Sequence, residues 1–133
     1  MLTIALLSLS LAHGPAVVPE EPLNASGGPL LPTQACYDVR HYDLRLTISP
    51  EERTIAGSLT MTAIARGDAS TIRLDLDDRL QVSAVRSQRG EVAYEHGDGR
   101  ILVEFDPAPG DGEEFDLTVD YAGAPRTAPR PPW

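Results

Sequence analysis

Residues 36–48 read CYDVRHYDLRLTI, and the alternation within this stretch decides the fold class of the chain. In the segment YDLRLTI, residues 42–48, an apolar side chain recurs at every second position with polar ones between. Successive residues of a β-strand point to opposite faces, so this period of two predicts a strand with one face towards a core. His41 stands near the start of the strand, between two tyrosines, and raises the question of whether it binds a metal.

The same period recurs further along the chain, interrupted by turn residues. Pro50 ends the first strand, because proline presets a turn dihedral and cannot donate to a strand ladder. Asp98 and Gly99 supply the positive backbone dihedrals of a tight hairpin. With no sustained helical period, the chain is predicted to be all-β: an antiparallel sandwich or saddle-like twisted sheet of about seven strands. The other strands are predicted at residues 55–65, 71–76, 80–85, 91–95, 101–105 and 115–121.

The two ends of the chain differ in composition from the body. Residues 1–14 include an apolar run too short to span a bilayer, which predicts a signal peptide, with a mis-set start codon as the alternative. Residues 15–35 are predicted to be a disordered Pro/Gly-rich linker, and residues 125–133 a Pro-rich tail. The β domain is expected over residues 36–124. A secreted or periplasmic location and no membrane span follow from these assignments.

The charge balance argues against a nucleic-acid partner. The formal net charge is −9, from 20 acidic residues against 11 basic residues, all of them arginine. Proteins that bind nucleic acids normally carry a clustered basic face that replaces counterions along the phosphates. No arginine cluster stands out here, and the negative charge is expected to keep a surface domain soluble.

The histidines and the cysteine do not have the spacing of a catalytic metal site. None of His13, His41 and His96 lies four residues from another, so a helical zinc-peptidase motif cannot form. Cys36 and His41 together supply only two of the ligands that a tetrahedral zinc site needs. The sequence therefore favours a structural strand histidine at His41.

The acidic clusters are also interpreted as structural. Residues 75–78 resemble the start of a calcium loop, but leucine and arginine stand at positions 80 and 86, where the loop needs glycine and glutamate. Glu113 and Glu114, as neighbours on a strand, would point to opposite faces and not work as an acid–base pair. We predict no catalytic residue, no cofactor-binding residue and no metal ligand in this chain.

Five segments in the same order resemble the amino-terminal domain of the aminopeptidase N family, the M1 zinc metallopeptidases. The opening YDVRHYDLRL, residues 37–46, is similar to the first strand of that domain, which typically begins YDVxHYDLxL. The match covers nearly all of the chain outside the linker. The other four segments are residues 55–58, residues 74–82, residues 112–125 and, as in bacterial members, PPW at 131–133.

The resemblance implies a non-catalytic part of a zinc aminopeptidase. In that family the histidine of the opening motif belongs to the sheet, while a GAMEN-type strand and an HExxH helix bind the substrate amine and the zinc. Neither motif occurs in this sequence. The resemblance thus implies a domain truncated before the catalytic domain, inactive alone, with that domain as its partner and with zinc and peptide substrate only in the parent enzyme. The alternative is a free-standing exported β-sandwich binding module.

Overall fold

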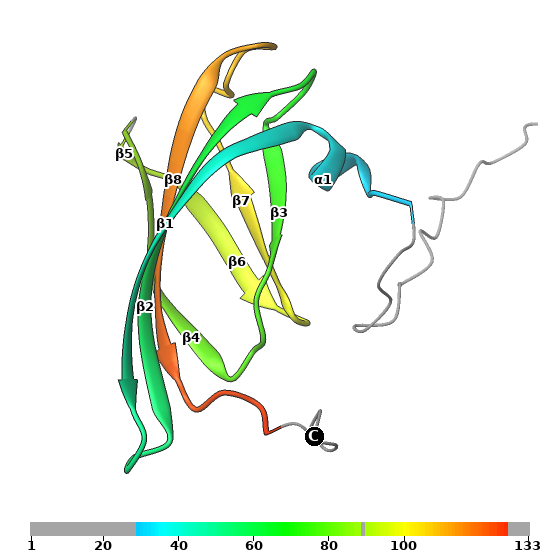
Figure 1. The fold of residues 1–133 in the computed structure, drawn as a ribbon. Helices are drawn as coiled ribbons and strands as arrows, with labels where there is room; N and C mark the ends of the chain where they lie inside the picture. Colours follow the sequence, from blue (N-terminus) through cyan, green and yellow to red (C-terminus); the bar gives the residue numbers. More distant parts are fainter. Residues whose placement is uncertain (1–28, 89, 128–133) are drawn as a thin grey trace, which may run out of the picture.

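The computed structural model describes residues 29–88 and 90–127, which form two antiparallel sheets (Figure 1). The predicted signal peptide, most of the predicted linker and the last part of the predicted tail lie outside the described residues. The elements are α1 (Pro32–Ala35), β1 (Tyr37–Ser49), β2 (Thr54–Ala65), β3 (Thr71–Asp75), β4 (Leu80–Ser87), β5 (Gly90–Glu91), β6 (Ala93–Gly97), β7 (Arg100–Glu104) and β8 (Glu114–Gly123).

The two sheets pack face to face as a sandwich. One has five strands in the order β1-β2-β8-β4-β5, and the other has three in the order β3-β7-β6. Figure 1 shows the smaller sheet covering only part of the larger, twisted one, beyond which the β1–β2 hairpin extends. The predicted all-β antiparallel class is confirmed. The additional strand is β5, which has two residues and pairs with the end of β4.

The core lies between the facing sheets, where the inward positions of the strands meet. Met61 of β2 and Leu117 of β8 stand opposite each other in the register and are both buried. Ile72 and Val103, which pair across β3 and β7, belong to the same buried cluster. The cluster also contains Cys36, Ala63, Ala65, Ala69, Val85, Ile101, Phe105, Phe115 and Val119.

The opposite face of the five-stranded sheet is polar. Thr60 and Thr118 share a hydrogen bond of 2.9 Å across β2 and β8. The Ser58 hydroxyl donates to Asp120 over 2.6 Å, and Arg86 forms an ion pair with the same carboxylate. Both interactions lower the pKa of Asp120, and the hydrogen bond from Ser58 has the larger effect. The period of two read from the sequence thus separates an apolar inner face from a solvated outer one.

The turns follow the chemistry of their residues. Arg53 has a φ of 55° and donates its N–H to the Pro50 carbonyl over 3.3 Å, closing the β1–β2 hairpin. Asp98 and Gly99 have φ values of 54° and 72° and join β6 to β7. The hairpin predicted at Asp98 and Gly99 is confirmed. Its strands extend further towards the turn than predicted, since β6 ends at Gly97 and β7 begins at Arg100.

A short helical turn, α1, lies within the stretch predicted to be a linker. Proline at the first helical position presets φ, and the N–H groups of Gln34 and Ala35 both donate to the Leu31 carbonyl over 2.9 Å. The turn packs beside β3. Among the described residues, no helix is long and apolar enough to cross a membrane.

The apolar side chains of the opening strand share one face as predicted, but the expectation that they join a core is wrong. Tyr42, Leu44, Leu46 and Ile48 remain 54%, 52%, 45% and 62% exposed. At the usual rise per residue, β1 extends for about 44 Å, whereas the five-residue strands of the smaller sheet extend for about 17 Å. The smaller sheet is therefore too short to cover this part of the inner face.

Candidate functional site

Four exposed apolar side chains of the described residues lie on one face of β1: Tyr42, Leu44, Leu46 and Ile48, here called the β1 patch. In the register, these residues stand opposite Met61, Leu59, Gly57 and Ile55 of β2. Contiguous apolar surface of this kind is uncommon on isolated soluble domains and marks a place where another surface packs.

A groove of about 500 Å³ continues from the β1 patch into the space between the sheets. Its floor is apolar, and its walls come from strands of both sheets. A concave apolar site with a few polar groups at its edge suits the binding of an apolar side chain or segment rather than chemical catalysis. The lining residues include Tyr42, Leu44, Leu59, Leu74, Leu76 and Tyr121.

Gly57 sets the position of one wall of the groove. A Cβ atom at Gly57 would lie 2.4 Å from Cζ of Tyr121, the residue opposite it on β8. The Tyr121 ring therefore lies over the glycine, in space that any other residue would occupy. This close approach supplies a physical reason for glycine in the segment IAGS, residues 55–58.

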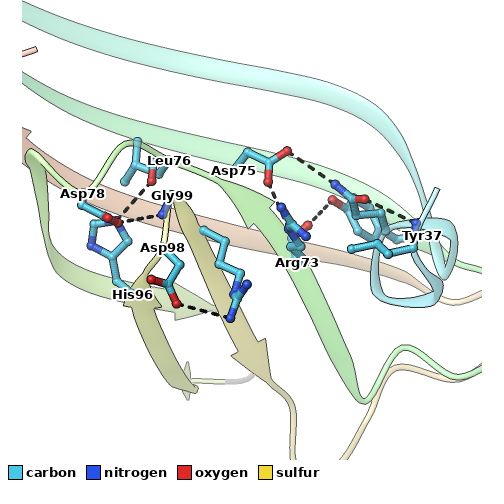
Figure 2. Close-up of polar contacts among 11 residues, drawn as sticks. Tyr37, Arg73, Asp75, Leu76, Asp78, His96, Asp98 and Gly99 are labelled. Carbon is cyan, nitrogen blue, oxygen red and sulfur yellow. Dashed lines mark hydrogen bonds and ion pairs between the residues drawn. The ribbon is translucent and has the colours of Figure 1, made fainter. Parts of the chain in front are cut away.

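A polar cluster borders the groove where α1 and β1 meet β3 (Figure 2). The Tyr37 hydroxyl donates to the Arg73 carbonyl over 2.7 Å. The Arg73 guanidinium contacts Asp75 at 3.1 Å, and the Gln34 amide donates to the other oxygen of that carboxylate over 3.4 Å. The cluster fixes the first residues of β1 to the smaller sheet.

The pKa of Tyr37 is raised to about 12, first because burial disfavours the phenolate, then because of Tyr42, Cys36 and Asp75. The pKa of an unfolded tyrosine is about 10. The pKa of Tyr37 is thus higher in the folded than in the unfolded chain. The neutral phenol therefore contributes to the stability of the fold in full below pH about 10, and this contribution is lost as the pH rises towards 12.

We expect Tyr37→Phe to reduce the loss of stability at alkaline pH, because the buried phenol no longer resists ionisation. At neutral pH the variant should lose about 1 kcal/mol with the hydrogen bond to Arg73. Urea midpoints measured between neutral pH and pH of about 11 test this. Tyr94→Phe, at a more exposed tyrosine, is the control and should follow the parent. Parallel curves for the parent and Tyr37→Phe would contradict the assignment.

A second polar cluster lies at the far end of β3 (Figure 2). Nε2 of His96 is 3.4 Å from the Leu76 carbonyl and 3.9 Å from Asp78. Asp78 in turn accepts the Gly99 N–H over 2.8 Å. His96 thus bridges β6 to the β3–β4 connection, and its surroundings are those of a structural histidine.

The carboxylates that resemble a calcium loop are used within the fold. Asp77 accepts the Arg79 N–H over 3.0 Å and pairs with Arg126 at 2.7 Å. The Arg126 hydrogen bond is the first cause, and the Arg79 hydrogen bond the second, of the lowered pKa of Asp77. These contacts cap the β3–β4 turn and hold the residues after β8 against it.

The histidines, the cysteine and the glutamate pair that the sequence analysis set aside as site residues have separate surroundings in the structure. Cys36 is buried with its thiol 3.6 Å from the Thr71 carbonyl, whereas His41 is exposed and pairs in the register with Thr62 on the polar face. Glu114 is exposed at the start of β8, and the neighbouring Glu113 accepts the Gly110 N–H over 2.7 Å. His13 lies outside the described residues.

A zinc ion does not fit the described part of the chain. Within residues 29–88 and 90–127, no group of three histidine, cysteine, aspartate or glutamate side chains is placed to hold a metal. A catalytic zinc site needs three protein ligands around one point with a further position open.

The comparison with solved structures points to one group of enzymes, whereas two other comparisons found no match. No model of a known family matches the chain, and no curated protein is significantly similar to it. Among solved structures, a mutant M1 zinc metallopeptidase from Deinococcus radiodurans bound to a Tyr-Ser-Ala substrate is 34% identical, with a TM-score of 0.62. The match covers 73% of this chain and 23% of that one.

A two-domain M1 zinc metallopeptidase bound to L-arginine is 33% identical, with a TM-score of 0.65 over 75% of this chain and 23% of its own. The predicted resemblance to the M1 zinc metallopeptidases is confirmed. Native yeast LTA4 hydrolase shares only the fold, at 22% identity and a TM-score of 0.53, over 66% of this chain and 14% of that one. The chain thus resembles the amino-terminal region of M1 metallopeptidases and spans about 23% of the first two enzymes.

The sequence correctly predicted the strand that carries the candidate site but not the exposure of that site. The alternation in residues 42–48 is the same for a strand in a core and for one at an uncovered edge. The difference in length between the first strand and the three strands of the smaller sheet was a usable signal. It becomes informative only when the pairing of the strands is known.

Proposed function

We propose that this chain is the non-catalytic amino-terminal β domain of an M1-type zinc aminopeptidase, with the β domain at residues 36–124. In this role it packs against the catalytic domain and walls the substrate cleft. The parent enzyme would bind zinc and release amino-terminal amino acids from peptides. Export to a secreted or periplasmic location through the predicted signal peptide is part of the proposal.

The observation that carries the proposal is the match to M1 zinc metallopeptidases, at 33–34% identity over about three quarters of this chain. The β1 patch supports it, because a domain that packs on a neighbour carries apolar surface that the neighbour covers. On this proposal, the isolated chain supplied with zinc does not hydrolyse aminoacyl-anilides.

The first test is to read the coding DNA beyond Trp133. An HExxH codon run in any frame supports the proposal, and the segment that carries it can then be expressed separately. We expect that segment to form a one-to-one complex with this chain and to cleave aminoacyl-anilides faster in the complex than alone. An in-frame stop followed by an unrelated gene would favour the free-standing binding module.

Two neighbouring substitutions on β1 test whether the β1 patch is the contact surface. Leu46→Asp places a charge in the patch, whereas Thr47→Asp places the same charge on the polar face one residue away. Burying an unpaired carboxylate is costly, so Leu46→Asp should weaken the complex by at least about tenfold in calorimetry. Thr47→Asp should bind like the parent. Equal affinities for both variants would show that the catalytic segment binds elsewhere.

A further inference from the structure

The outer edge of β1 has no neighbouring strand within the described residues. The strand lies at one end of the five-stranded sheet and is 13 residues long. The other end strands of the two sheets are much shorter, with two residues in β5 and five each in β3 and β6. A long edge strand presents a row of backbone N–H and C=O groups that can pair with another strand.

Two devices that usually protect such an edge, a bulge and a proline, are confined to the ends of β1. A shift in the register between Val39 and His41 interrupts the start of the strand, and Pro50 follows its last residue. From His41 to Ser49, β1 pairs with β2 without a further shift. A bulge or proline within this part of the strand would discourage pairing, but neither occurs there.

We propose that this edge binds the same edge of a second copy of the chain, antiparallel, about a two-fold axis at Leu44. In this register, Asp43 of each copy faces Arg45 of the other, so two opposite-charge pairs form by symmetry. Both side chains are available, since Arg45 is 84% exposed and Asp43 is 57% exposed, with 4.0 Å between them in one chain. Opposite charges directly across two strands stabilise the pairing.

The apolar positions fit the same register. Tyr42 of each copy faces Leu46 of the other, and the two Leu44 side chains face each other. Side chains directly opposite on one face of an antiparallel pair lie close enough to pack. The two β1 patches therefore join into one apolar surface, and the backbone groups of both edges are paired.

Shifted registers lose this complementarity. A two-fold axis at Asp43 places the two aspartates opposite each other, and an axis at Arg45 does the same for the two arginines. An axis at Leu46 places Arg45 opposite Thr47 and leaves Asp43 without an arginine. The charges thus favour the axis at Leu44, and the pairing uses the strand edge without relying on the proposed packing of the face against a catalytic domain.

Exchanging the charges of Asp43 and Arg45 tests the proposed register. The association of each full-length variant is measured by sedimentation velocity over a range of concentrations. We expect the parent chain to dimerise. Asp43→Arg and Arg45→Asp should each raise the dissociation constant by about tenfold or more, because each turns two attractive cross-strand pairs into repulsive ones. The double variant with both substitutions restores opposite charges and should return to within about threefold of the parent.

An effect of net charge alone would give a different order of affinities, so the test separates it from the specific pairing of Asp43 with Arg45. Asp43→Arg reduces the net negative charge of −9, so a general effect of charge would strengthen association. Glu104→Arg, an equal change of charge on the other sheet, is the matched control and should leave the dimer unchanged. Far-UV circular dichroism of dilute samples verifies that each variant folds.

Three results would overturn the proposal. The parent chain could be monomeric at every concentration. Asp43→Arg and Glu104→Arg could both strengthen association, which would indicate a general charge effect. The double variant could dimerise as weakly as the single variants, which would exclude the axis at Leu44.

Discussion

Replacing Leu117 by alanine is expected to lower the free energy of unfolding by about 3 kcal/mol. Leu117 is fully buried on β8, between β2 and β4, and stands opposite Met61 in the register. The substitution removes the buried methyl groups and leaves a cavity that the paired strands on both sides prevent from collapsing. In a domain of this size, such a loss is a large share of the total stability.

Leu44→Ala is the matched control, since it makes the same chemical change on the same face of the same sheet. Leu44 is 52% exposed, so its truncation should cost about 1 kcal/mol or less. Urea denaturation of dilute samples, with the slope of the transition compared between variants, measures both losses. Similar losses at the two positions would mean that the β1 patch is buried in solution, contrary to the structure.

Gly123→Ala is expected to destabilise the fold by about 2 kcal/mol, through crowding rather than a cavity. A Cβ atom at Gly123 would lie 2.2 Å from the Arg79 carbonyl oxygen and 3.2 Å from Cα of Leu80. Both contacts are with backbone at the start of β4, which pairs with Gly123 in the register. Relief of the contact therefore requires the start of β4 or the end of β8 to move.

Gly97→Ala is the control for this substitution, because a Cβ atom at Gly97 meets no atom within 4 Å. It should be neutral or slightly stabilising, since alanine restricts the unfolded chain more than glycine does. Thermal unfolding followed by circular dichroism compares the two variants with the parent. A Gly123→Ala variant as stable as Gly97→Ala would show that the two strand ends are farther apart in solution.

The sequence by itself determined the class of the fold and most of its strands. The period of two in residues 42–48 and in the later segments separates an apolar from a polar face whatever the pairing. Proline at position 50 and the Asp98-Gly99 step end strands for local steric reasons, so these turns were readable before the structure was known. The segment order that resembles the M1 metallopeptidases was likewise present in the sequence alone.

Only the tertiary structure decided which apolar positions are covered. Leu44 and Leu117 follow the same alternation, yet one is half exposed and the other fully buried. The difference arises because β8 lies between two strands beneath the smaller sheet, whereas β1 lies at an edge and extends beyond it. Contacts between segments far apart in the chain also bring Gly123 against Arg79 and bury Tyr37 beside Arg73. Periodicity specifies the direction of a side chain, while its burial depends on what the rest of the chain places over it.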